Sequence, residues 1–87
     1  MPEDGLLSFP CELPIKVLGR NDVAFRKAAV RIVRRHFADL DEKQISEQES
    51  RNRSYLSLTF VVPAQSRDEA DALFRELTAS EDIIMVF

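Results

Sequence analysis

Two side chains of this sequence could serve as a nucleophile, a general base or a metal ligand, and each stands alone. His36 is the single histidine and Cys11 the single cysteine among 87 residues. A zinc site or an activated nucleophile needs several converging groups, and neither residue has such partners at a suitable spacing. We therefore expect structural or surface roles for both, with no catalytic residue, no bound metal and no cofactor.

A second group of side chains is basic and suits the binding of anions. Its members are Arg26, Lys27, Arg31, Arg34 and Arg35. On a helix they would share one side, and a basic helix can bind phosphate backbones or acidic proteins. The alternative is pairing with acidic residues of a second predicted helix, namely Asp68, Glu69, Asp71 and Glu76. We expect this pairing to explain much of the basic patch.

Overall composition argues against several classes of partner. The net charge of −3 and the pI near 5.1 give no general attraction to nucleic acid or to an anionic membrane. No apolar run approaches the roughly 20 residues that cross a bilayer. The first ten residues lack the basic and long apolar segments of a signal peptide, and a lone cysteine cannot form an internal disulfide. We expect a cytoplasmic protein without a membrane or nucleic-acid partner.

The elements that position these side chains follow from hydrophobic periodicity. Residues 1–12 contain two prolines and a glycine and predict an N-terminal lead-in, followed by a single domain over residues 13–87. Alternating residues predict a strand from Leu13 that ends at Gly19. Apolar residues at three- and four-residue spacing then predict a helix over residues 23–37, capped by Asn21 or Asp22.

The second half of the chain also predicts strands and a helix. Residues 42–50 predict a weak, solvated strand that must lie at a sheet edge. A clear strand follows from Tyr55 and stops at Pro63, and the Ser66 and Glu69 pair predicts the capping box of a second helix. The final IIMVF run predicts a last strand in which Ile83, Met85 and Phe87 are buried while Ile84 and Val86 face the other side.

Strand, helix, strand, strand, helix, strand is the βαββαβ order of the ferredoxin-like fold. We therefore predict an α+β two-layer sandwich with antiparallel strand order 4-1-3-2 and both helices on one face. RNA-recognition motifs share this topology, and the third strand RSYLSLTF matches their pattern at Arg53, Tyr55 and Phe60. Ser57 replaces the central stacking aromatic, so we do not expect RNA binding.

ACT domains, which sense amino acids, also share this topology and bind effectors at a glycine after the first strand. Gly19, Arg20 and Asn21 occupy that place and form a candidate ligand loop. The proline–glycine pair usual in ACT domains is absent, and any tight turn from a strand to a helix favours glycine. The alternative is that Gly19 only turns the chain.

Several short motifs together resemble the YbeD-like family of small bacterial proteins of unknown function. They are Phe9 and Pro10, KVLG at 16–19, Arg35 and His36, YLSLT at 55–59, and the C-terminal MVF. The resemblance implies a ferredoxin-like domain similar to the regulatory ACT domain of a biosynthetic dehydrogenase, with no established catalytic residues. It also suggests a link to lipoate metabolism or to enzyme regulation.

From these observations we predict a non-enzymatic regulatory or adaptor domain that binds a protein partner. The candidate interaction surface consists of Lys16, Leu18, Tyr55, Thr59, Ile84 and Val86. It borders a last strand that could also support a homo-oligomer, because an apolar sheet edge favours strand addition. The alternative function is a sensor of an amino acid or a lipoate-related metabolite at the loop of Gly19, Arg20 and Asn21.

Overall fold

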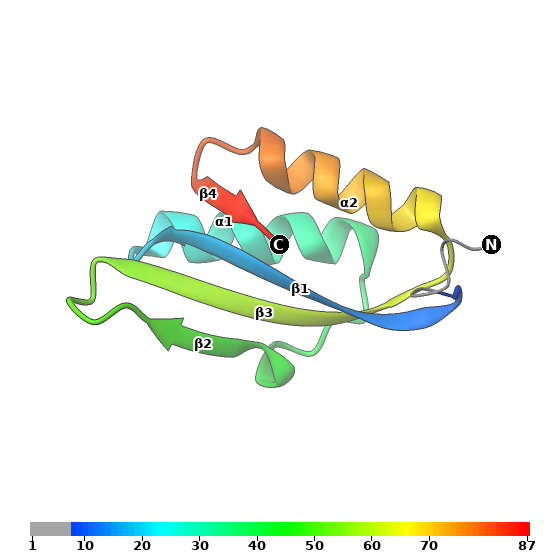
Figure 1. The fold of residues 1–87 in the computed structure, drawn as a ribbon, viewed down its shortest axis with the longest axis horizontal. Coiled ribbons are helices and arrows are strands. Elements are labelled where there is room, and N and C mark those ends of the chain that lie inside the picture. The colour runs from blue at the N-terminus through cyan, green and yellow to red at the C-terminus, as the bar shows by residue number, and fades with distance from the viewer. Residues whose placement is uncertain (1–7) are drawn as a thin grey trace.

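The computed structural model describes residues 8–87, which form one four-stranded sheet and two α-helices (Figure 1). In chain order the elements are β1 (Cys11–Arg20), α1 (Val23–His36), the 3₁₀ helix η1 (Glu42–Gln44), β2 (Ser46–Glu49), β3 (Tyr55–Ala64), α2 (Arg67–Ala79) and β4 (Ile83–Val86). The strands pair antiparallel in the order β2-β3-β1-β4. The predicted ferredoxin-like fold and strand order are confirmed.

One face of the sheet carries the core, because alternate residues of β1 and β3 point toward the helices. Burial of one large apolar side chain stabilises a fold by roughly 1.5 to 3 kcal/mol. The cluster joins Ile15, Val17, Leu56, Leu58, Phe60 and Val62 of the sheet to Phe25, Ala29, Ile32 and Val33 of α1 and to Leu73 and Leu77 of α2. The intervening strand residues therefore form an open face that neither helix covers.

Both helices begin at side-chain caps, as the sequence predicts. Asp22 is the cap of α1, and its carboxylate accepts a hydrogen bond from the Phe25 amide at 2.8 Å. Ser66 caps α2 and accepts from the Glu69 amide at 3.2 Å, while the Glu69 carboxylate accepts from the Gln65 amide at 2.8 Å. The second cap is thus the expected capping box, with its return bond one residue earlier than usual.

The central strands are longer than predicted. β1 begins at Cys11 and continues through Gly19, and β3 continues through Pro63 to Ala64. Proline has no backbone N–H group to donate to a neighbouring strand. The backbone N–H and C=O groups of an antiparallel strand alternate in direction, so every second residue directs them away from a given neighbour. A proline at such a position costs no hydrogen bond to that neighbour. Pro63 faces away from β1, and β2 pairs only as far as Thr59, so no ladder bond is lost.

β4 corrects the predicted alternation of the last strand. Val86 pairs with Val17 and Met85 with Leu18, but Gly19 pairs with Ile83, so Ile84 is an extra residue in a β-bulge. The bulge keeps Ile83 in the core but reverses the remainder of the strand. Val86 packs partly buried against the core, whereas Met85 and Phe87 are exposed. The prediction that Val86 lies on the open face is wrong, and so is the predicted burial of Met85 and Phe87.

The edge strand β2 and the N-terminal lead-in can also be compared with their sequence predictions. β2 is fully exposed and at the sheet edge, as predicted, but it is shorter than the predicted strand of residues 42–50, because Glu42–Gln44 form η1 instead. The predicted lead-in over residues 1–12 is shorter, because Cys11 and Glu12 already pair with β3, and residues 1–7 lie outside the described part of the chain. Within residues 8–87 no helix is long and apolar enough to cross a membrane.

Candidate functional site

The predicted interaction surface centres on the open face of β1. Lys16 lies opposite Thr59 of β3, and on its other side it exchanges two backbone hydrogen bonds with Phe87, of 2.7 and 2.8 Å. Leu18 lies opposite Met85 of β4. The Lys16 ammonium is 5.5 Å from the centre of the Phe87 ring, a distance suited to a cation–π contact. The fold thus gathers Lys16, Leu18 and Thr59 and adds two apolar residues that sequence reasoning had placed in the core.

Exposed apolar side chains concentrate at this end of the sheet. Of the six large apolar side chains exposed in residues 8–87, three lie between positions 84 and 87: Ile84, Met85 and Phe87 are 52%, 53% and 54% exposed. Tyr55, which was also predicted, is 43% exposed and pairs with Arg20 at the end of the β1–β3 ladder. We call Lys16, Leu18, Ile84, Met85 and Phe87 the β4 surface.

The outer edge of β4 adds backbone groups to the β4 surface. Phe87 directs its N–H and C=O toward Lys16 of β1. Since backbone direction alternates along an antiparallel strand, Val86 directs its own pair away from β1. β4 is the last strand on this side of the sheet of residues 8–87. A free donor and acceptor therefore stand next to exposed apolar side chains.

The candidate ligand loop is tightly packed at its first residue. Gly19 is buried, and a Cβ atom at this position would lie 2.1 Å from Cδ1 of the Phe25 ring. Its backbone has no positive φ. Gly19 is therefore required because the Phe25 ring occupies the space of a side chain, and it lies within β1 rather than at a turn.

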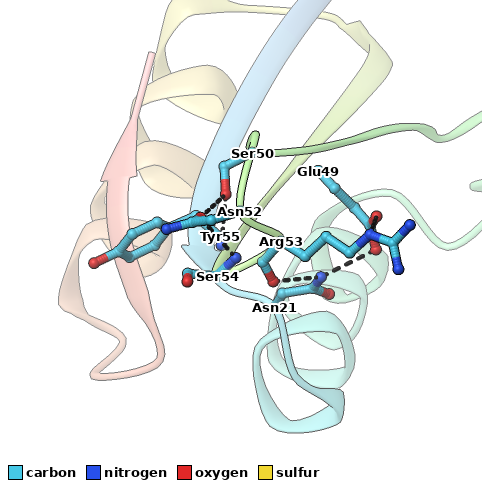
Figure 2. Close-up of polar contacts among 7 residues, drawn as sticks. All are labelled: Asn21, Glu49, Ser50, Asn52, Arg53, Ser54 and Tyr55. Atoms are coloured by element: carbon cyan, nitrogen blue, oxygen red, sulfur yellow. Dashed lines mark hydrogen bonds and ion pairs between the residues drawn. The ribbon is translucent and has the colours of Figure 1, made fainter.

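The third residue of the loop is tied to the turn between β2 and β3 (Figure 2). The Asn21 side-chain amide donates to the Glu49 carboxylate and to the Arg53 carbonyl, each at 3.0 Å. The Asn21 backbone N–H donates to the Ser54 carbonyl at 3.0 Å. These bonds occupy the N–H donors that Asn21 could offer to a small ligand, while Arg20 is exposed.

The same turn holds a backbone outlier. Arg53 has φ of 63°, the left-handed region that residues with a side chain rarely adopt. Ser50 and Asn52 stabilise this turn, because Asn52 accepts from the Ser54 amide at 3.1 Å and Ser50 Oγ accepts from the Tyr55 amide at 3.1 Å (Figure 2). The arrangement directs the Arg53 carbonyl at Asn21, which joins β2 to the start of α1.

The basic side of α1 pairs less with α2 than predicted. Arg35 forms an ion pair with Glu76 of α2, but Arg26 pairs with Glu47 of β2, and Arg34 pairs with Glu42 of η1 at 2.8 Å. Lys27 and Arg31 form no ion pair with residues 8–87. Lys27, Arg31 and Arg35 also follow one another at four-residue spacing, and each such like-charge pair destabilises a helix by about 0.2 to 0.5 kcal/mol.

His36 contacts α2, and Cys11 lies at the start of β1. His36 Nε2 is 2.8 Å from the Glu76 carboxylate, which also pairs with Arg35, so the histidine joins α1 to α2. Cys11 is a half-buried free thiol in the first residue of β1. In the described part of the chain, no group of histidine, cysteine and carboxylate side chains has the geometry of a metal site.

Comparison with known proteins identifies the family. Residues 4–87 match the family described as Protein of unknown function, DUF493. The chain belongs to the DUF493 family. It is 36% identical over 77 residues to the UPF0250 protein of Nitrosomonas europaea, covering 88% of each chain. It is 39% identical over 80 residues to that of Hahella chejuensis, covering 92% of this chain and 88% of the relative. The YbeD-like resemblance is confirmed.

A solved structure supports the same fold for this DUF493 chain. The solution structure of protein HP0495 from H. pylori superposes with a TM-score of 0.73, covering 100% of this chain and 94% of the other. The two sequences are 13% identical, so the likeness concerns the fold alone. The family description carries no activity, and function must be argued from the surfaces of the molecule.

Proposed function

We propose that this DUF493 chain is a non-enzymatic regulatory or adaptor domain of the cytoplasm that binds an extended segment of a partner protein along β4. The observation that carries the proposal is the concentration of exposed apolar side chains at Ile84, Met85 and Phe87, beside Val86 backbone groups that have no ladder partner within residues 8–87. In strand addition, main-chain hydrogen bonds provide affinity, and alternate side chains provide specificity.

The chemistry of the β4 surface fits a segment with alternating apolar residues. Leu18 and Met85 are neighbours on the open face, and the Phe87 ring extends this apolar area under the Lys16 ammonium. An added strand would place every second side chain beside Met85 and Phe87, while its backbone pairs with Val86. The Lys16 charge favours a segment with a carboxylate near the apolar residues.

The test is a double variant, Met85→Lys with Phe87→Lys, used as bait with the wild-type chain in native pull-downs. Both side chains are exposed, so the variant should remain folded while losing the partner. A matched control adds the same charge on the open face far from β4 through Val61→Lys with Ser46→Lys, and it should retain the partner. In the recovered complex, amide exchange at Val86 should slow, because strand addition protects its outward N–H group.

Equilibrium sedimentation identifies the occupant. Self-association that the double variant abolishes would mean that the partner segment belongs to a second copy of this chain. Identical partners and identical mass for the wild type and the double variant would exclude the β4 surface.

The metabolite sensor remains the alternative and has its own test. It requires a ligand at Gly19, Arg20 and Asn21, where Phe25 and the β2–β3 turn already contact the first and third residues. Titration calorimetry with amino acids and lipoyl compounds should give saturable heat that Arg20→Ala removes if the sensor function is right. The packing of this loop favours the partner-binding function.

A further inference from the structure

The outer side of α1 holds a shallow hollow of about 520 Å³, which we call the α1 groove. Its lining consists of Arg26, Lys27, Val30, Arg31, Arg34, Arg35 and Glu42. We propose that the α1 groove binds an acidic segment of a partner protein that also carries apolar side chains. This site is separate from the β4 surface, and the argument for it does not depend on the proposed function.

The charge of the α1 groove is the first support. It carries five cations and one carboxylate in a chain whose net charge is −3. The side chains of Arg26, Arg34 and Arg35 are exposed, and ion pairs of exposed side chains are weak, so a partner carboxylate can replace them. Lys27 and Arg31 have no ion pair within residues 8–87 that a partner would need to replace.

The placement of Lys27 and Arg31 has no structural benefit in the described residues. Lys27, Arg31 and Arg35 repel one another along the helix, and Lys27 and Arg31 lie before the last turn, where cations would complement the helix dipole. A row of like charges that weakens its own helix is expected where a ligand of opposite charge binds.

The groove chemistry favours a protein over a nucleic acid. Val30 is half-buried against the core and gives the groove an apolar floor between the cations. No aromatic side chain lines it, whereas single-stranded nucleic acid is held by stacking on aromatic residues. A long polyanion would also meet the acidic remainder of the molecule. An acidic segment with leucine-like side chains could pair its carboxylates with the cations and pack its apolar side chains on Val30.

The groove and the β4 surface lie toward opposite edges of the sheet. Arg26 of the groove pairs with Glu47 of β2, and β2 and β4 are the two edge strands. Figure 1 shows β3 and β1 between them. Two partners could therefore occupy the molecule together, as an adaptor requires.

The test measures fluorescence anisotropy with three labelled probes matched in length to the 14 residues of α1. They are a glutamate peptide with leucine at every fourth position, the same peptide with serine in place of leucine, and single-stranded RNA. The leucine peptide should bind tightest, and its affinity should fall as salt screens the charges. Arg31→Glu should weaken this binding by at least about tenfold.

Arg31→Glu is informative because it should not destabilise the protein. The new carboxylate would lie four residues from both Lys27 and Arg35 and would replace two repulsions with two attractions. The matched control Arg51→Glu makes the same charge change in the β2–β3 turn and should bind within about twofold of the wild type.

Three results would overturn the proposal. Equal binding of the leucine peptide by the wild type and Arg31→Glu would exclude the groove. Equal affinity for the serine and leucine peptides would show that the proposed apolar contact at Val30 does not contribute to binding. Tighter binding of RNA, with the same loss in Arg31→Glu, would assign the groove to a phosphate backbone.

Discussion

The sheet has two edge strands of four residues each, and their chemistry is opposite. β2 (Ser46–Glu49) is polar throughout, fully exposed, and tied to α1 through the Glu47 ion pair with Arg26. β4 (Ile83–Val86) is apolar and exposes Ile84 and Met85. Charged side chains on an edge discourage further strand pairing, whereas an apolar edge permits it. One edge of the sheet therefore disfavours the pairing of a further strand, and the other edge permits it.

This comparison assigns stability to the central strands and the proposed binding to an edge. The largest expected effect is thus Phe60→Ala in β3, where Phe60 is fully buried opposite Ile15. Removing a buried aromatic side chain should lower the free energy of unfolding by about 3 to 5 kcal/mol. Denaturant unfolding followed by circular dichroism measures it. An unchanged midpoint would show that the centre of the sheet is not the stabilising part.

The next effect tests the junction between β1 and β4. Gly19→Ala places a methyl group 2.1 Å from a Phe25 ring that is itself buried, so one of the two must move. Overpacking of this kind costs about 1 to 3 kcal/mol, and we expect the upper end. The neighbouring substitution Arg20→Ala, at an exposed position, serves as the control. Equal denaturant midpoints for the two variants would show that the Phe25 ring moves aside at little energetic cost and that Gly19 is not required for packing.

Two lysine substitutions separate the sides of β4. Val86→Lys places a charge against the core and should lower the free energy of unfolding by about 1 to 2 kcal/mol. Ile84→Lys, at the exposed extra residue of the bulge, should change it by less than about 0.5 kcal/mol. Thermal melts of the two variants provide the measurement. A larger loss of stability for Ile84→Lys than for Val86→Lys would mean that β4 follows the regular alternation predicted from the sequence.

The sequence was sufficient for features that depend on local patterns. The predicted features are a cap of α1 at Asn21 or Asp22, the Ser66 cap of α2, the buried face of β3 and the solvated edge at β2, and each follows from side chains within a few residues. The strand order also followed, since βαββαβ topology strongly restricts the arrangement.

Features that depend on contacts between distant segments were missed. The bulge at Ile84 depends on how β4 meets Gly19, which lies beneath the Phe25 ring, and nothing in IIMVF indicates an extra residue. Met85 and Phe87 were therefore assigned to the core instead of the β4 surface. The partners of the basic helix were missed for a similar reason, because Glu42 and Glu47 reach α1 only through the fold.

The smallest effect concerns the turn that secures the closed edge. Arg53 in the left-handed region costs about 1 to 2 kcal/mol, and Arg53→Gly relieves it. Glycine also gains about 0.5 to 1 kcal/mol of entropy in the unfolded chain, so the net gain should be about 0.5 kcal/mol relative to Arg53→Ala. Both variants lose the exposed Glu49 contact, so their difference isolates the backbone. The denaturant midpoint of Arg53→Gly should be higher than that of Arg53→Ala. The opposite order would mean that the backbone at position 53 leaves the left-handed region in solution. The turn would then hold β2 less firmly than β4 is held.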